Sequence, residues 1–352
     1  MHTIEILQFE ELLSAMKTGK IRPEHIKEFL KNPDSVFFRN QWTQKFIGLV
    51  PRDARPNFVQ LVEGKPFYCA RRNGKWQMVY GGWESELFES EPTGYGVAEG
   101  KVYYHLKIGD SYAVFHGDTQ KFVSYEPGSL ASLYYQNGQF WFIARRDGAQ
   151  YFVNGDKETK LRKPYDGRAA VSDGGQFCYI TKTNNQLTLI QSKKEIRLPY
   201  KEAWCLKFAD EKLAYIAQHS EKGYRVVWGK KEYPTFHSIN VVNGLSFADG
   251  QPLYVANDEK GRSLIVHGDS ILSSLEHQGI GSLQLVGGKP AYFHHTVENA
   301  KTELSRPVSI CYWGALQTKA YDHAFSMHTE GRELVFGANI GREIYRVSRA
   351  ID

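Results

Sequence analysis

A short turn signal recurs at nearly constant spacing from residue 63 onward. Each copy places two small, acidic or glycine residues between two runs of apolar, strand-forming residues. The pairs are Glu63-Gly64, Glu99-Gly100, Asn137-Gly138, Gly174-Gly175, Asp210-Glu211, Asp249-Gly250, Gly287-Gly288 and Glu330-Gly331. Counted between second residues, the spacings are 36, 38, 37, 36, 39, 38 and 43. A period this regular indicates a repeated structural unit.

Each unit has the pattern of short strands rather than helices. Residues 58–62 before the first turn and 66–70 after it are apolar, and a third run, such as residues 75–80, follows a polar turn. Turn pairs that tolerate positive φ suit two-residue β-hairpins. The units lack the i, i+3, i+4, i+7 apolar spacing of helices, which excludes a helical solenoid. Many third runs end at a glycine: Gly81, Gly117, Gly155, Gly229, Gly268 and Gly314.

A fourth, shorter and more polar run completes each unit. Four strands in 36 to 43 residues is typical of a propeller blade, whereas a β-helix uses shorter repeats. Aromatic residues, 14% of the chain, also favour strands. We therefore predict an all-β fold: a single closed eight-bladed β-propeller of four-stranded blades over residues 35–352, with seven blades as the alternative.

The last unit predicts how the ring closes. It ends at Asp352 after only three strands, and a closed ring leaves no strand edge free. The apolar segment at residues 45–50 lies upstream of the first complete unit. We expect it to supply the missing strand by pairing with residues 343–348.

Residues 1–34 fall outside the repeat and predict a short helical hairpin. Leu12, Leu13 and Met16 share one helical face, Gly19 ends that helix, and Pro23 opens a second. So small a hairpin cannot bury its apolar stripe alone. It is either a cap packed on the blades or a docking element for a partner.

Some residues around the turns match a known repeat. They are Gly64-Lys65 with Tyr68-Cys69-Ala70, Gly250 with Tyr254-Val255-Ala256, and the later pairs Tyr165-Asp166 and Tyr321-Asp322. This pattern resembles the bacterial WD-like and TolB-like propeller repeats over about residues 45 to 352. The resemblance implies the fold only, because the Trp-Asp dipeptide of WD repeats is absent.

The cysteines and the N-terminus bear on the compartment. Cys69, Cys178, Cys205 and Cys311 are far apart, lie in apolar runs and form no C-x-x-C pair, which favours free thiols in a reducing compartment. The first thirteen residues lack the basic and apolar signature of a secretory signal. No apolar run is long enough to span a bilayer. We expect a cytoplasmic protein without membrane association.

The candidate binding residues lie in the second-to-third-strand turns and in the connections between units, which share one face of a propeller. These residues are Arg71, Arg72, Arg145, Arg146, Tyr165, Asp166, Tyr200, Lys201, His237, Tyr321, Asp322 and His323. One interpretation is a pocket in which Tyr and Arg bind a peptide, sugar or nucleotide. The other is structural: aromatics that recur at the repeat period wedge between blades, and the charges hold the loops.

No motif nominates a catalytic or metal site. The chain lacks a Gly-x-Ser-x-Gly elbow, a His-Glu-x-x-His helix, a phosphate loop and the sialidase aspartate box. His294, His295 and Glu298 form the best metal-like group, but neighbouring residues on a strand point to opposite faces. We predict no metal and no cofactor.

Three functions remain open. The leading one is a non-catalytic scaffold that presents its loop face, and the segment 1–34, to another protein. The second is an enzyme or small-ligand binder at the channel mouth, with Glu126, Asp166 and Asp322 as acids and His237 and His323 as bases. The third is nucleic-acid binding, which requires the four arginines and Lys201 to form one basic patch. The net charge is only +5, and the basic residues are scattered among acidic ones, so nucleic-acid binding is the least favoured of the three functions.

Overall fold

The computed structural model describes residues 42–49, 59–109, 111–126, 129–172, 174–191, 194–219, 223–241, 244–275, 280–298, 306–313, 316–318, 321–340 and 342–351. The hairpin predicted over residues 1–34 lies outside these ranges. All secondary structure in the described residues is β-strand and turn.

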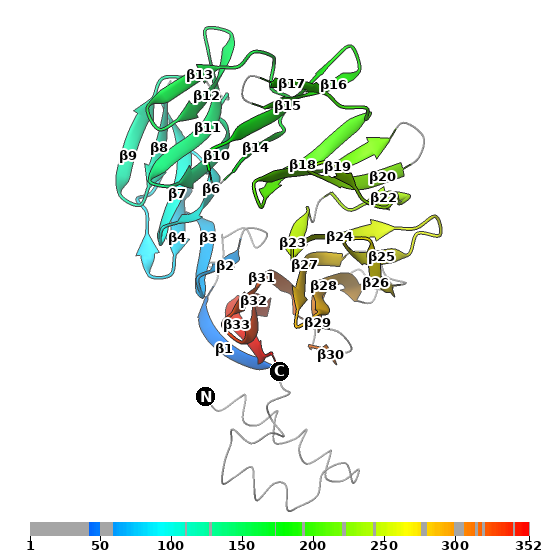
Figure 1. Cartoon of the computed structure of the whole chain (residues 1–352). Helices are drawn as coiled ribbons and strands as arrows, with labels where there is room; N and C mark the ends of the chain where they lie inside the picture. The colour runs from blue at the N-terminus through cyan, green and yellow to red at the C-terminus, as the bar shows by residue number, and fades with distance from the viewer. Residues whose placement is uncertain are drawn as a thin grey trace, which may run out of the picture.

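The described strands form eight antiparallel sheets, which follow one another around a ring (Figure 1). The chain is therefore an eight-bladed β-propeller, which confirms the predicted fold and rules out the alternative of seven blades. We number the blades I to VIII in chain order and call their strands a to d from the channel outward. In each blade neighbouring strands pair antiparallel, so the turns alternate between two faces of the ring.

The first four blades contain β2 to β17. Blade I has β2 (Gln60–Val62), β3 (Lys65–Arg72), β4 (Lys75–Tyr80) and β5 (Trp83–Glu84). Blade II has β6 (Thr93–Ala98), β7 (Lys101–Ile108), β8 (Ser111–His116) and β9 (Thr119–Val123). Blade III has β10 (Ala131–Gln136), β11 (Gln139–Arg146), β12 (Ala149–Asn154) and β13 (Lys157–Lys160). Blade IV has β14 (Ala169–Val171), β15 (Phe177–Thr183), β16 (Gln186–Gln191) and β17 (Lys194–Arg197).

The remaining blades contain β18 to β33 and β1. Blade V has β18 (Glu202–Ala209), β19 (Lys212–His219), β20 (Gly223–Trp228) and β21 (Lys231–Glu232). Blade VI has β22 (Ser238–Ile239), β23 (Ser246–Ala248), β24 (Gln251–Asn257), β25 (Ser263–His267) and β26 (Ser270–Leu275). Blade VII has β27 (Ile280–Val286), β28 (Lys289–Glu298), β29 (Arg306–Trp313) and β30 (Leu316–Gln317). Blade VIII has β31 (His323–Glu330), β32 (Glu333–Ile340), β33 (Glu343–Ala350) and β1 (Thr43–Leu49).

Strand β1 closes the ring as the outer strand of blade VIII. It pairs antiparallel with β33, with Thr43 opposite Ser348 and Leu49 opposite Glu343. Figure 1 shows the two ends of the propeller, blue β1 and red β33, side by side. The last blade is thus built from both ends of the described chain.

Most a–b turns have the predicted residues and conformation. Asn137 and Gly138 both have positive φ, of 52° and 74°, as the favoured hairpin turn requires. Two turns differ from the prediction. In blade VIII the turn residues are Gly331 and Arg332, because β31 extends through Glu330. In blade IV the turn is longer, since β14 ends at Val171 and β15 begins at Phe177.

A polar contact recurs at the ends of the c strands of blades II, V and VII, just before a glycine that the sequence singled out. The indole Nε1 of Trp228 donates to the carbonyl oxygen of Ala209 at 3.1 Å, and that of Trp313 donates to Val286 at 3.0 Å. His116 Nε2 makes the same contact with Ala98, at 3.0 Å. Each contact ties the end of the third strand to the end of the innermost strand.

A bulge recurs in the innermost strands of blades II, III, V, VII and VIII. In blades III, V and VIII a non-glycine residue at the bulge has φ near +54°: Ser132, Cys205 and Ser326. Their side chains reach the next blade: Ser132 Oγ lies 2.8 Å from Tyr165 Oη, and Cys205 Sγ lies 3.2 Å from the Val241 carbonyl. The bulges therefore link neighbouring blades beside the channel.

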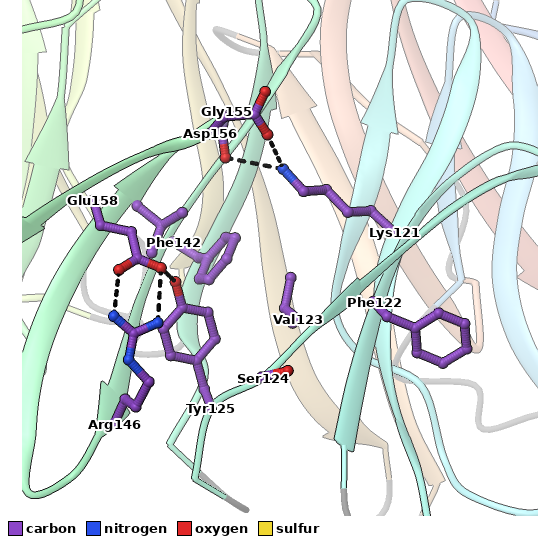
Figure 2. A pocket seen from close by; sticks show the side chains of 11 residues that line it. Lys121, Phe122, Val123, Ser124, Tyr125, Phe142, Arg146, Gly155, Asp156 and Glu158 are labelled. Carbon is purple, nitrogen blue, oxygen red and sulfur yellow. Dashed lines mark hydrogen bonds and ion pairs between the residues drawn. The ribbon is translucent and has the colours of Figure 1, made fainter.

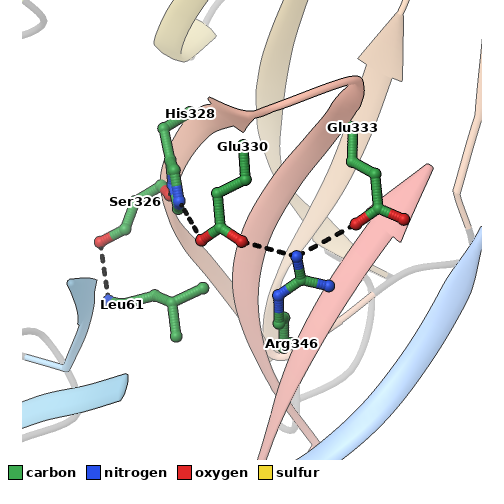
Figure 3. A network of polar contacts seen from close by, with 6 residues as sticks. All are labelled: Leu61, Ser326, His328, Glu330, Glu333 and Arg346. Atoms are coloured by element: carbon green, nitrogen blue, oxygen red, sulfur yellow. Dashed lines mark hydrogen bonds and ion pairs between the residues drawn. The ribbon is translucent and has the colours of Figure 1, made fainter. Parts of the chain in front are cut away.

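The same contact spans the closure of the ring. Ser326 Oγ in blade VIII accepts a hydrogen bond from the Leu61 backbone N–H of blade I at 2.9 Å (Figure 3). Beside it, Arg346 donates to Glu330 at 2.7 Å and to Glu333 at 3.1 Å, which joins the three chain-terminal strands. Hydrogen bonds from Arg346 and then from His328 lower the pKa of Glu330. This network fixes the blade that closes the ring.

Apolar cores lie between blades rather than within one. Buried Val114 of blade II and Phe142 of blade III belong to one cluster. Phe293 of blade VII and Phe336 of blade VIII belong to another, and both are fully buried. Because each sheet covers its apolar face with its neighbour, the blades depend on one another for stability.

Candidate functional site

The first arginine pair serves its own blade. Arg71 Nε donates to the Gly74 carbonyl oxygen at 2.9 Å, and its guanidinium lies 5.8 Å from the Trp76 ring centroid. Arg72 forms a two-pronged contact with Glu84, with distances of 2.9 and 3.0 Å. Both side chains hold the b–c turn and the outer strand of blade I.

The second arginine pair is held in the same way in blade III. Arg145 Nε donates to Glu126, whose other oxygen accepts the Gly148 backbone N–H at 2.7 Å. Arg146 contacts both oxygens of Glu158, at 3.1 and 2.6 Å. The hydrogen bond from Gly148, together with Arg145, lowers the pKa of Glu126. Glu126, a candidate acid of the enzyme alternative, thus anchors a loop.

Tyr165 and Asp166 lie in the connection that leads into blade IV. The Tyr165 backbone N–H donates to Gln150 Oε1 at 2.7 Å, and its hydroxyl meets Ser132 of the blade III bulge. The Asp166 carboxylate lies 4.0 Å from Arg168 Nε. Tyr165 is therefore a link between blades, whereas Asp166 belongs to a larger charged group.

That group, which we call the blade IV–V cluster, consists of Asp166, Arg168, Lys182 and Glu202. Arg168 Nη1 donates to Glu202 Oε2 at 2.8 Å and to the Ala203 carbonyl at 2.9 Å, and Lys182 donates to the other Glu202 oxygen. The four residues come from the connection into blade IV, the end of its b strand and the start of the a strand of blade V. Their side chains are 20 to 29% exposed.

The pKa values of the two carboxyl groups in the blade IV–V cluster shift in opposite directions. Burial raises the pKa of the Asp166 carboxyl; Arg168 opposes this rise, and Glu202 adds to it. Burial also acts to raise the pKa of Glu202, but hydrogen bonds from Lys182 and Arg168 outweigh it, so that pKa is lowered. The Arg168 guanidinium also lies 5.7 Å from the Trp204 ring centroid. The cluster is a fixed arrangement of charges that solvent reaches.

Tyr200, Lys201 and His237 extend this part of the loop face. Tyr200 is buried, and its hydroxyl donates to Glu232 at 2.7 Å. The backbone N–H of Lys201 pairs with the Gln218 carbonyl at 2.9 Å, whereas its side chain is exposed. His237 is exposed in the connection into blade VI. Lys201 directly precedes Glu202 of the cluster.

Tyr321, Asp322 and His323 lie at the start of blade VIII. Tyr321 is buried, and its hydroxyl accepts a hydrogen bond from Gln44 of β1 at 2.8 Å. The backbone N–H of Asp322 pairs with the Asn339 carbonyl at 3.0 Å. Burial lowers the pKa of His323, whose ring lies 5.9 Å from that of Phe325. This trio contributes to ring closure.

The structure therefore brings together only part of the predicted set. Asp166 and Lys201 lie at or beside the blade IV–V cluster, while the arginine pairs are two blades apart. Three of those arginines are already paired with carboxylates. They do not supply the free basic patch that nucleic-acid binding requires.

Sequence reasoning missed Arg168, Lys182 and Glu202. Along the chain, Arg168 lies 14 residues before Lys182, and Lys182 lies 20 residues before Glu202. The repeat itself could have indicated this contact, because the end of each b strand lies on the same face of the propeller as the start of the a strand in the next blade. Aligning Lys182 with Glu202 on that basis would have predicted the contact.

The thiols and histidines provide no activated group in the described structure. Burial raises the pKa of Cys178 to about 12, which keeps its thiol protonated. Among the described residues, no three His, Cys, Asp or Glu side chains gather as they would around a metal ion. His294 packs near Tyr312, whereas the side chains of His295 and Glu298 lie outside the described residues.

Comparisons with known proteins agree with the fold. No protein-family model and no curated protein sequence matches the chain. BamB from Moraxella catarrhalis matches with 8% identity and a TM-score of 0.51, over 87% of this chain and 100% of that one. The WD40 domain of SCAP from fission yeast matches with 9% identity and a TM-score of 0.47, over 88% and 98% of the two chains. Apo AztD from Citrobacter koseri matches with 10% identity and a TM-score of 0.47, over 84% and 90%.

At these identities, the similarity shows the fold alone. The predicted resemblance to propeller repeat proteins is confirmed at that level. Across the described ranges, no helix combines the length and apolarity that crossing a membrane requires.

Proposed function

We propose that this protein is a non-catalytic binding scaffold whose loop face engages a macromolecular partner, most simply another protein. The observation that carries this proposal is the blade IV–V cluster. It presents charges of both signs, drawn from two successive blades, at one accessible place on a rigid ring.

Preorganised charges suit recognition of a charged partner surface. Arg168 is fixed by Glu202, Ala203 and the Trp204 ring, so little side-chain freedom is lost when a partner binds. Complementary charges across an interface contribute specificity and fast association more than affinity. Lys201, which is exposed beside the cluster, would contact the same partner.

We place this function in the cytoplasm. All four cysteines are free in the structure, and Cys69, Cys178 and Cys311 are buried. Free thiols are typical of a reducing compartment.

A charge-altering double variant tests the proposal. We expect Asp166→Asn/Lys201→Glu to reduce recovery of specific partners at least ten-fold when tagged protein is isolated from host lysate and quantified by mass spectrometry. Lys231→Ala/Asp269→Ala is the matched control, because it removes an exposed ion pair, 2.7 Å long, from the rim of blades V and VI. Equal recovery by wild type and both variants would contradict a role for the cluster.

The same isolation with residues 1–34 deleted tests the N-terminal segment. Loss of partners with retained folding assigns docking to that segment. Retained partners assign it to the propeller. Loss of folding identifies the segment as a cap.

A further inference from the structure

An exposed apolar patch lies on the outer part of blade VIII, around the strand that closes the ring. Phe46 and Leu49 of β1 are 52% and 54% exposed, and Ile340 at the end of β32 is 37% exposed. Tyr345 of β33 completes the patch, because its ring meets that of Phe46 edge-on with the centroids 6.1 Å apart. We call these four residues the blade VIII patch.

A bulge in β1 places the four side chains on one side of the sheet. Phe46 lies opposite Tyr345, and after a shift of register Leu49 lies opposite Glu343. Ile340 also lies opposite Glu343, on the other side of β33. Opposite residues of an antiparallel pair point to the same face, and a bulge changes the alternation along its own strand. The patch therefore spans three neighbouring strands.

This side of blade VIII faces blade VII. Gln44, two residues before Phe46 on β1, donates to the Tyr321 hydroxyl in the connection from blade VII. Phe336 and Val347, on the same side of the sheet, are fully buried in the core between the two blades. The outer strand of blade VII, β30, has only two residues. The patch thus continues a buried core outward to a surface that the blades leave open.

Blade II offers a comparison. Its outer strand β9 begins with the same Thr-Gln-Lys-Phe run as β1, and its Phe122 is 63% exposed. Figure 2 shows Phe122 and Val123 on opposite sides of that strand. The strand ends at Val123, whereas β1 continues for three residues beyond Phe46. Ala113 lies opposite Phe122, where the patch has Tyr345. The exposed ring of blade II therefore lacks two of the neighbours that form the blade VIII patch.

The sequence before β1 supplies a matching apolar surface. Leu12, Leu13 and Met16 are predicted to share one helical face, and so short a segment cannot bury that face alone. The segment needs an apolar partner, and the blade VIII patch needs a cover.

The chain between them is long enough to allow the contact. Trp42 is held against the Phe336 ring, with the centroids 5.6 Å apart. Seven residues, 35–41, separate Trp42 from the segment and span at most about 25 Å. Phe46 and Leu49 lie about 13 and 23 Å along the strand from Trp42 at the usual rise per residue. The segment can therefore reach the whole patch.

The short connection also favours binding within one chain. Two groups joined through so few residues meet at an effective concentration on the order of millimolar. A second copy or a separate partner that offered the same contacts would compete only at a similar concentration. The segment of the same chain is therefore the favoured occupant of the patch.

We propose that residues 1–34 pack through their apolar face on the blade VIII patch of the same chain. The segment is then an intramolecular cap, which also shields the outer edge of β1, the last strand of its sheet, from pairing with other chains. This contact goes beyond the proposed binding function, which depends on the blade IV–V cluster, so either proposal can fail without the other.

Photo-crosslinking in the full-length protein tests the contact. Phe46 is replaced with p-benzoylphenylalanine, the protein is irradiated, and crosslinked peptides are identified by mass spectrometry. We expect crosslinks from position 46 to residues 1–34 within the monomer. The same replacement at Phe122 is the matched control and should give at least ten-fold fewer crosslinks to that segment. No crosslink to the segment, crosslinks only between two copies, or equal yields from the two positions would each overturn the proposal.

Hydrogen exchange gives a second readout. Phe46→Ser/Leu49→Ser should speed amide exchange in residues 8–30 at least ten-fold, because the segment loses the surface that protects it. Phe122→Ser/Ile271→Ser removes two similarly exposed side chains from other outer strands and should leave this exchange within two-fold of wild type. Exchange in β32 should stay unchanged in both variants, which shows that the ring remains closed. Equal exchange of the segment in wild type and in Phe46→Ser/Leu49→Ser would contradict the cap.

Discussion

Replacing Phe336 with alanine is expected to destabilise the propeller by about 3–5 kcal/mol, the usual cost of truncating a buried phenylalanine. The side chain has no exposed surface and lies on β32 of the closing blade. Its ring makes edge contacts with Trp42, Phe293 and Tyr321, with centroid distances of 5.6, 5.3 and 6.0 Å. One truncation therefore loosens the contact of blade VIII with both blade VII and the closing segment.

Chemical denaturation of the purified variant measures this loss. The matched control is Phe122→Ala, since Phe122 is 63% exposed and its removal should change stability by less than about 0.5 kcal/mol. Similar midpoints for the two variants would show that the cluster around Phe336 does not limit stability.

Blade number and blade order could be predicted because the turn chemistry is local. A residue pair such as Asn137-Gly138 adopts its hairpin conformation from its own φ preferences, and the period then follows by counting. The closing strand could also be found, because the last unit has only three strands and residues 45–50 are apolar. Neither step depends on contacts between distant residues.

The inner strands could not be predicted in the same detail. Ser132, Cys205 and Ser326 have positive φ at bulges, although their residue types give no such preference. Their conformation is held by contacts with the next blade, such as that of Ser326 with Leu61. Blade VI shows the same dependence, because its inner strand is split into β22 and β23, which both pair with β24.

The partners of the candidate site residues could not be predicted for a related reason. Arginines near b–c turns suggested a basic surface, yet Arg72 and Arg146 are matched by Glu84 and Glu158, each twelve residues later in the same blade. The paired acids lie on short outer strands that the sequence marks only as polar. Net charge along the chain therefore could not show which cations are available to a ligand.

Contacts between blades follow the period as well. Lys121 pairs with Asp156 and Lys231 pairs with Asp269, at separations of 35 and 38 residues. In both pairs the aspartate lies in the c–d turn of the next blade, about one repeat after the lysine. The scaffold therefore uses charged residues at these equivalent positions to join neighbouring blades.

Removing residues 1–49 is expected to abolish the folded ring, whereas removing residues 1–34 leaves the closing strand β1 in place. The longer deletion exposes the edge of β33, including buried Ile344 and Val347. It also removes Trp42, which lies against Phe336 and beneath the Arg349 guanidinium, 5.6 Å from its ring centroid. The lost ladder and packing amount to at least about 5 kcal/mol, comparable with the whole stability of many domains.

Size-exclusion chromatography and thermal denaturation compare the two deletions. The 1–49 deletion should aggregate through its open strand edge or show no cooperative transition, because an unpaired flat edge recruits other chains. A synthetic peptide of residues 42–50, added during refolding, should restore a cooperative transition by supplying β1 in trans. If the two deletions melt at the same temperature as monomers, pairing of β1 with β33 does not hold the ring together, and the contacts of Ser326 and Phe336 with their neighbouring blades must be sufficient.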